Sequence, residues 1–126
     1  MTETPSRSVS LAIPPKPDYI VLARLALSAI CRLTPLAPDD VADLKLAVSE
    51  VATERLAGNP DGSVRLAFEL HDDRLVVDLH AGSVPAGSED QLSRAIVEAT
   101  VDEAVYADGS VRLVKRLPDN PIELDA

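Results

Sequence analysis

Two glutamates, Glu50 and Glu54, are the side chains in this chain best suited to chemistry. They lie in the stretch LAVSEVATERLAGN, residues 46–59, and their four-residue spacing places both carboxylates on one face of a helix. Like charges at this spacing repel by about 0.3 kcal/mol, whereas a divalent cation held between them would offset the repulsion. The pair is therefore either part of a functional site or a solvent-exposed helix face, and the surrounding elements must decide between the two.

Helices are predicted where a proline and an acidic residue start an apolar pattern. The carboxylate helix would begin near Pro38 and stop at Gly58-Asn59-Pro60, a strong C-terminal signal. In the last helix, Leu92, Ile96 and Ala99 have core spacing and the first turn is acidic. The predicted helices cover residues 18–33, 38–57 and 89–103.

Strands are predicted where apolar and polar residues alternate between turn signals. Asp72-Asp73 and Asp108-Gly109 are hairpin turns, and residues 82–88 form a loop of small residues. The predicted strands cover residues 8–13, 63–71, 74–80, 104–107 and 110–116. The order β-α-α-β-β-α-β-β predicts an α+β two-layer sandwich, a mostly antiparallel sheet with helices on one face. One domain would span residues 8–116, between an N-terminal tail, 1–7, and a C-terminal tail, 117–126.

Composition fits one soluble domain with an aliphatic core, because the 126 residues include only three aromatic ones. No apolar run reaches membrane-spanning length and no signal peptide is recognisable, so we expect a cytoplasmic protein. The single cysteine, Cys31, lies in an apolar helical stretch and is expected to be a buried structural thiol.

The net charge of −9 argues against binding to nucleic acid, which normally needs a basic surface. An acidic surface suits a basic protein partner, or serves solubility alone. Arg24 is the only charged residue between Tyr19 and Cys31. A lone arginine on such an apolar helix either snorkels to a surface edge or anchors a partner. No Ser-His-Asp, Cys-His or metal-ligand pattern is present, and no metal is assigned.

Three short segments, in this element order, resemble the RsbW-like family of partner-switching anti-sigma factors and serine-protein kinases, within the GHKL (HATPase) superfamily. The stretch AVSEVATE, residues 47–54, is similar to the family's A-V-S-E-A-C-T-N. Residues 15–24 resemble the entry to the family's first helix, and residues 97–103 resemble its I-E-x-L-M-D-E segment. The similarity covers about residues 8–116 and implies a Bergerat (HATPase-like) fold.

The resemblance implies a role for each aligned residue and also identifies what is lost. Glu50 falls on the family's catalytic glutamate, while Glu54 stands at the asparagine that holds magnesium. His80 and Gly82 fall on the aspartate and glycine of the D-x-G motif, whose aspartate reads the adenine. Gln91 and Ser93 replace two phosphate-cradling glycines, so the chain is predicted to be a degenerate member.

By the same resemblance, the arginine matching Arg24 lies on the surface that meets the sigma factor and its antagonist. The first interpretation is therefore an anti-sigma factor-like regulator that sequesters a sigma factor and is released by a STAS-type anti-anti-sigma factor, with no cofactor. The alternative is a divergent serine-protein kinase, with Glu50 catalytic and Glu54 holding Mg-ATP in a retained pocket. A third interpretation is a module of this fold that binds only STAS-type proteins. A homodimer is expected by resemblance, without nucleic-acid or membrane partners.

Overall fold

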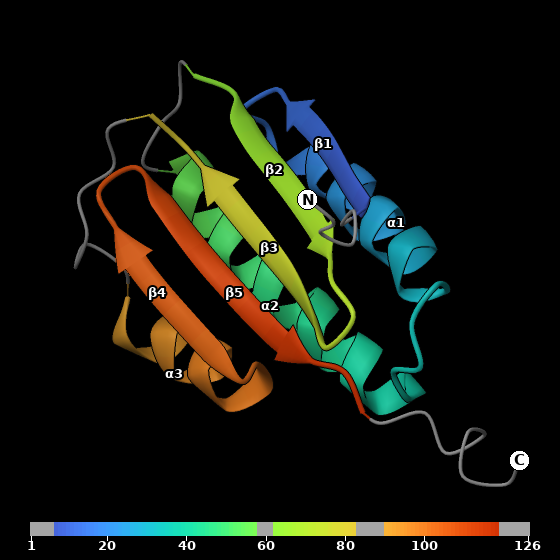
Figure 1. Ribbon diagram of the computed structural model, residues 1–126. Helices are drawn as coiled ribbons and strands as arrows, with labels where there is room; N and C mark the ends of the chain where they lie inside the picture. The colour runs from blue at the N-terminus through green and yellow to red at the C-terminus, as the bar shows by residue number, and fades with distance from the viewer. Residues whose placement is uncertain (1–6, 58–61, 83–89, 119–126) are drawn as a thin grey trace, which may run out of the picture.

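The computed structural model describes residues 7–57, 62–82 and 90–118. In this part of the chain, a five-stranded sheet forms one layer and three α-helices form a second layer on one face of it (Figure 1). The predicted α+β sandwich and its element order are confirmed. None of the helices in the described ranges has the length and apolar character needed to cross a membrane.

The sheet is antiparallel throughout, with strand order β1-β2-β3-β5-β4. Its strands are β1 (Arg7–Ile13), β2 (Val64–Leu70), β3 (Arg74–His80), β4 (Glu103–Ala107) and β5 (Ser110–Arg116). Each lies within two residues of its predicted bounds, because alternation and hairpin turns specify strands well. In register across the sheet, Leu66 faces Leu79 on β3, which in turn faces Val111 on β5. All three are fully buried beneath the helices.

The helices follow the predicted order with small shifts at their ends. A short 3-10 helix, η1 (Pro17–Tyr19), precedes α1 (Ile20–Cys31) and replaces the first turn of the predicted helix. The α1 helix ends two residues before the predicted Leu33, where Thr34 Oγ1 donates a hydrogen bond to the Cys31 carbonyl. The α2 helix (Pro38–Ala57) has the predicted bounds, and the expected stop at residues 58–60 lies outside the described residues.

The third helix, α3 (Gln91–Thr100), exists as expected but turns a different face to the core. Leu92 is 69% exposed and Ala99 is also exposed, so the prediction that they face the core is wrong. Ser93 and Val97, one turn apart, are buried instead. The helix starts later than predicted because Asp90 is its N-cap, accepting a hydrogen bond from the Ser93 N–H over 3.3 Å.

The core between the layers is aliphatic, as predicted. Phe68 is its one fully buried aromatic side chain among the described residues, and Cys31 is 5% exposed at the end of α1. The domain boundaries remain a prediction.

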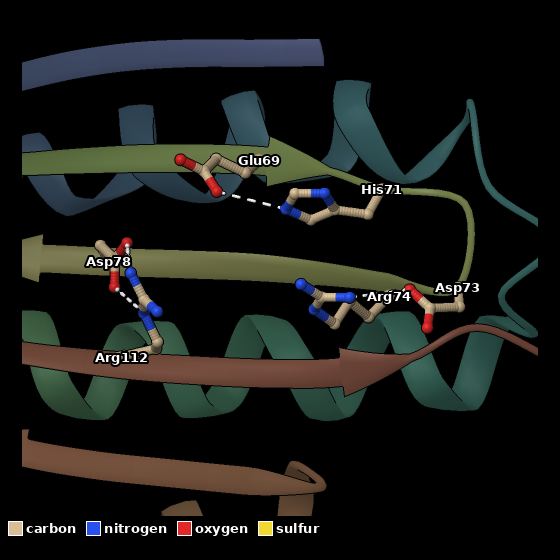
Figure 2. Close-up of polar contacts among 6 residues, drawn as sticks. All are labelled: Glu69, His71, Asp73, Arg74, Asp78 and Arg112. Carbon is tan, nitrogen blue, oxygen red and sulfur yellow. Dashed lines mark hydrogen bonds and ion pairs between the residues drawn. The ribbon is translucent and has the colours of Figure 1, made fainter. Parts of the chain in front are cut away.

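The opposite face of the sheet carries no helix and bears charged side chains (Figure 2), beside the buried Val76 and Val114, which are paired across β3 and β5. Asp78 accepts two hydrogen bonds from Arg112, from Nε at 2.9 Å and from Nη2 at 3.1 Å. This bidentate pair raises the pKa of Arg112, first through the hydrogen bonds and then through the charge of Asp78. On the same side, His71 Nε2 lies 3.2 Å from Glu69 Oε1. Polar side chains thus let the sheet face water on one side.

Candidate functional site

The α2 helix contacts the sheet, α3 and α1 through three different parts of its surface. One stripe is buried against the sheet and includes Leu44, Val48 and Val51. A flank toward α3 carries Glu50 and Glu54, both half-buried and one turn apart. The flank toward α1 carries Lys45, whose charge acts on Cys31 at the end of that helix. The two predicted site glutamates therefore share a flank, and the flank with Lys45 faces a different helix.

Glu54 is committed to a contact with α3. Its Oε2 accepts a hydrogen bond of 2.8 Å from the backbone N–H of Asp90, which lies 36 residues further along the chain. Because Asp90 is the N-cap of α3, this bond ties the last turns of α2 to the start of α3. Glu50 has no hydrogen bond or ion pair with any residue in the described ranges. The glutamates thus differ, since one is anchored and the other is available.

The positions predicted to have lost their phosphate-cradling glycines, Gln91 and Ser93, lie in the first turn of α3. Gln91 is exposed, whereas Ser93 is 6% exposed and its N–H is taken by the Asp90 carboxylate. Two carboxylates, from Glu54 and Asp90, thus already receive backbone N–H groups at this helix end. These are the groups through which a helix N-terminus binds anions.

His80 and Gly82 lie where β3 ends, apart from the glutamate pair. Leu79 is buried against the helices, so His80 projects to the helix-free face and is exposed. Gly82 adopts φ +64° and packs against the β4–β5 turn, where the Ala81 N–H donates to the Gly109 carbonyl over 2.9 Å. The structure therefore brings Glu50 and Glu54 together but gives His80 a different face of the sheet. Their roles toward a nucleotide stay predictions, and residues 83–88 of the predicted loop lie outside the described residues.

Arg24, on α1, lines a groove of about 330 Å³ between α1 and α2. Lys45 and Ser49 contribute polar groups to its wall, and Ala42 and Leu46 contribute apolar surface. Arg24 is exposed and forms no ion pair within the described part of the chain. This groove combines two cations with apolar walls on a protein whose net charge is −9.

Large apolar side chains also stand exposed on the two helices that form the groove. On α1, Val21 is 50% exposed, Leu22 is 41% exposed and Leu25 is 60% exposed. Leu46 on α2 is 45% exposed. We call these four residues, together with the groove, the α1–α2 surface. Exposed apolar side chains that cluster in this way are typical of protein–protein interaction sites.

Several residues of this region were not singled out by the sequence. Lys45 looks like an ordinary surface lysine, and only the packing of α2 against α1 places it beside Arg24. Asp90 was grouped with the acidic first turn, and only its cap geometry identifies its role. Lys115, 9% exposed, donates to the Thr100 carbonyl over 3.3 Å and lies 3.5 Å from Asp40 Oδ1. It anchors the C-terminal end of α3, opposite the Glu54 contact.

A metal centre finds no support in the side chains of residues 7–57, 62–82 and 90–118. No group of three or more His, Cys, Asp or Glu side chains is gathered there in a way that could hold a metal ion. Of the two glutamates expected to act on Mg-ATP, Glu54 already has one carboxylate oxygen engaged by the Asp90 N–H.

Comparison with known proteins gives consistent relatives. The chain is 34% identical over 73 residues to the serine-protein kinase RsbW of Listeria innocua, covering 55% of this chain and 46% of that protein. It is 36% identical over 74 residues to the serine-protein kinase RsbW of Bacillus licheniformis, with the same coverage. It is 33% identical over 72 residues to the protein of that name from Bacillus cereus, covering 55% and 45%. No family model matches the chain.

These relatives bear out the resemblance read from the three segments. The matched part spans about half the length of the curated relatives. The serine-protein kinase activity in their names belongs to those proteins.

Proposed function

We propose that this chain, which belongs to the RsbW-like family, is an anti-sigma factor-like regulator that sequesters a sigma factor by direct binding and does not use a nucleotide. A STAS-type anti-anti-sigma factor would release the sigma factor by competing for the same protein. Both partners are inferred from the family, whose curated members are named serine-protein kinases. The regulator would act in the cytoplasm.

The observation that carries this proposal is the α1–α2 surface. The α1 helix exposes three large apolar side chains, and a groove with two cationic residues, Arg24 and Lys45, lies between α1 and α2. Leaving such residues in water is unfavourable by about 25 cal/mol for each Å² of apolar surface that a partner would cover. Arg24 stands at the edge of this surface, where an arginine can stack on apolar atoms and bind a carboxylate. A protein partner could both cover the exposed apolar side chains and offer a carboxylate to Arg24.

The start of α3 supports independence from nucleotide. Its N–H groups at Asp90 and Ser93 already bond carboxylates of the chain. Bringing the phosphates of ATP close to Glu50, Glu54 and Asp90 would add negative charge to negative charge, which is unfavourable without bound metal.

The test is calorimetric titration of a sigma factor into the full chain with no nucleotide present. We expect binding in the wild type and at least tenfold weaker binding in Arg24→Glu. Arg65→Glu makes the same charge change on an exposed strand residue outside this surface and should bind as the wild type does. Equal binding by Arg24→Glu and the wild type would reject the α1–α2 surface as the binding site. Sedimentation of the chain alone tests the expected homodimer.

The second candidate is a divergent serine-protein kinase that phosphorylates its STAS-type antagonist. It is favoured by the relatives, which are named serine-protein kinases, and by Glu50, which matches the family's catalytic glutamate and has no partner within the described residues. Here Glu50 would polarise the reacting group and Glu54 would hold magnesium. Titration with Mg-ATP separates the two candidates, because micromolar binding that Glu50→Ala abolishes would select the kinase. A chain that captures STAS-type proteins and no sigma factor would select the third interpretation.

A further inference from the structure

The contact between Glu54 and Asp90 joins two helix ends that are remote in sequence. The Glu54 carboxylate comes from the last turn of α2 and accepts the Asp90 N–H at 2.8 Å. It is a charge-assisted hydrogen bond to the positive end of a helix dipole, which is a favourable place for an anion. The Glu54 carboxylate of α2 is thus an anion of the kind that a helix N-terminus binds.

Two of the backbone N–H groups at the start of α3 are already bonded to carboxylates of the chain. An α-helix leaves its first four N–H groups without partners inside the helix. Here the Asp90 side chain takes the Ser93 N–H, and the Arg94 N–H bonds the Asp90 carbonyl as the first turn closes. The Asp90 N–H, just before the helix, goes to Glu54. The N–H groups of Gln91 and Leu92, in the same turn, have no bond to another of the described residues, so a phosphate could reach them only by lying close to the Glu54 and Asp90 carboxylates.

We propose that Glu54 is a specificity-determining residue whose carboxylate excludes phosphate groups from the N-terminus of α3. The inference deepens the proposed nucleotide-independent function and rests on it. A glutamate suits this task because its carboxylate carries a full negative charge and its side chain reaches across to the backbone of α3. An asparagine, the residue that the family resemblance expects here, is neutral and one methylene shorter.

The proposal also explains how α3 is held without a ligand. Only Ser93 and Val97 of α3 are buried, so apolar packing alone fixes this helix weakly. Polar contacts restrain both of its ends, Glu54 at the start and Lys115 at the end. The resting position of α3 is thus defined by groups of the chain itself.

The experiment follows backbone amides by nuclear magnetic resonance in the ¹⁵N-labelled full chain. In the wild type, we expect the Asp90 amide to be protected from hydrogen exchange and unmoved by millimolar inorganic pyrophosphate or Mg-ATP. In Glu54→Ala, exchange at Asp90 should rise at least tenfold, and both probes should shift the Asp90 and Ser93 amides. Glu54→Gln keeps an acceptor without the charge and should give an intermediate response.

The control is Glu98→Gln, which removes a carboxylate of α3 that pairs with Arg94 on the exposed side of that helix. It should leave Asp90 exchange and probe response as in the wild type. Unchanged Asp90 exchange in Glu54→Ala would overturn the proposal. So would faster exchange with no response to either probe, because Glu54 would then be a structural contact only. A wild-type response equal to that of Glu54→Ala would also overturn it.

Sigma-factor binding, measured on the same samples, keeps the two proposals distinct. Wild-type protein that captures the partner while its Asp90 amide responds to pyrophosphate would refute the exclusion role and leave the proposed function intact. Wild-type protein that ignores both probes and captures no partner would refute the proposed function and leave the exclusion role standing.

Discussion

Gly82 and Gly109 meet backbone to backbone where the β4–β5 turn lies against the end of β3. Gly109 has φ +76°, and a Cβ built there would collide with the Gly82 carbonyl oxygen. The neighbouring hydrogen bond, from the Ala81 N–H to the Gly109 carbonyl, holds the turn in place. Gly109 thus has a structural reason to be glycine, and Gly82 has a separate one in its own φ of +64°.

Gly109→Ala is therefore expected to destabilise the fold by about 1–3 kcal/mol, because it adds a clash to a left-handed backbone conformation. Urea denaturation measures the loss. Asp72→Ala, an exposed position in the other hairpin turn, should change stability by no more than about 0.5 kcal/mol. Equal stability of Gly109→Ala and the wild type would show that the turn can move away from β3.

The face that α3 turns to the core can be tested by two truncations. Val97→Ala removes two methyl groups from a fully buried side chain and should cost about 2 kcal/mol. Leu92→Ala removes more apolar carbon from a side chain that is 69% exposed, and it should cost less than about 0.5 kcal/mol. If Leu92→Ala destabilised the protein more than Val97→Ala in thermal denaturation, α3 would turn to the core the face predicted from the sequence.

This helix shows where sequence reasoning stops. Strands and hairpins followed from alternation and turn residues, and α2 followed from its start at Pro38. In and just after α3, apolar residues at 92, 96, 97, 99 and 101 allow two overlapping stripes, and periodicity alone does not choose between them. The choice depends on the Asp90 cap and on contacts with α2. The same limit applies to the site, because a bond between residues 54 and 90 leaves no local signal.

The stability of the fold should fall when Lys115 loses its charge. Its Nζ donates to the Thr100 carbonyl, a free acceptor at the C-terminal end of α3, and lies near Asp40 at the start of α2. Lys115→Met keeps most of the apolar stem but leaves that carbonyl without its donor, and we expect a loss of about 1–2 kcal/mol. Lys16→Met, on an exposed loop residue, is the matched control for chemical denaturation. A stable Lys115→Met variant would mean that water replaces the ammonium group.

The thiol of Cys31 should make stability depend on alkaline pH. Burial raises the pKa of Cys31, while the nearby Lys45 charge acts to lower it. Because the folded state keeps the proton longer than the unfolded state, no stability is lost below the ordinary thiol pKa of about 8.5. Above it, stability falls as pH rises toward the folded-state pKa. Urea denaturation at pH 7.5 and 10 should show a larger decrease for the wild type than for Cys31→Ala, and equal decreases would contradict this.

The α1–α2 surface should separate binding from stability. Leu25→Gln alters a side chain that is 60% exposed, so its melting temperature should match that of the wild type. Capture of the sigma factor should weaken at least tenfold, because the apolar contact with the partner is lost. Val105→Gln, 51% exposed on the edge strand β4, is the control for a polar change at an equally exposed residue. Weakened capture by both variants would point to a nonspecific effect.

The three flanks of α2 also bear on where substitutions along this helix can be tolerated. One helix of twenty residues fills the core, forms a wall of the groove and holds the start of α3. Residues of one flank recur every three to four positions along α2. A substitution on one flank therefore need not alter the contacts that the other two flanks make. A substitution on the Glu50–Glu54 flank can therefore leave the flank toward α1 unchanged. Tolerance to substitution along α2 should rise and fall every three to four residues.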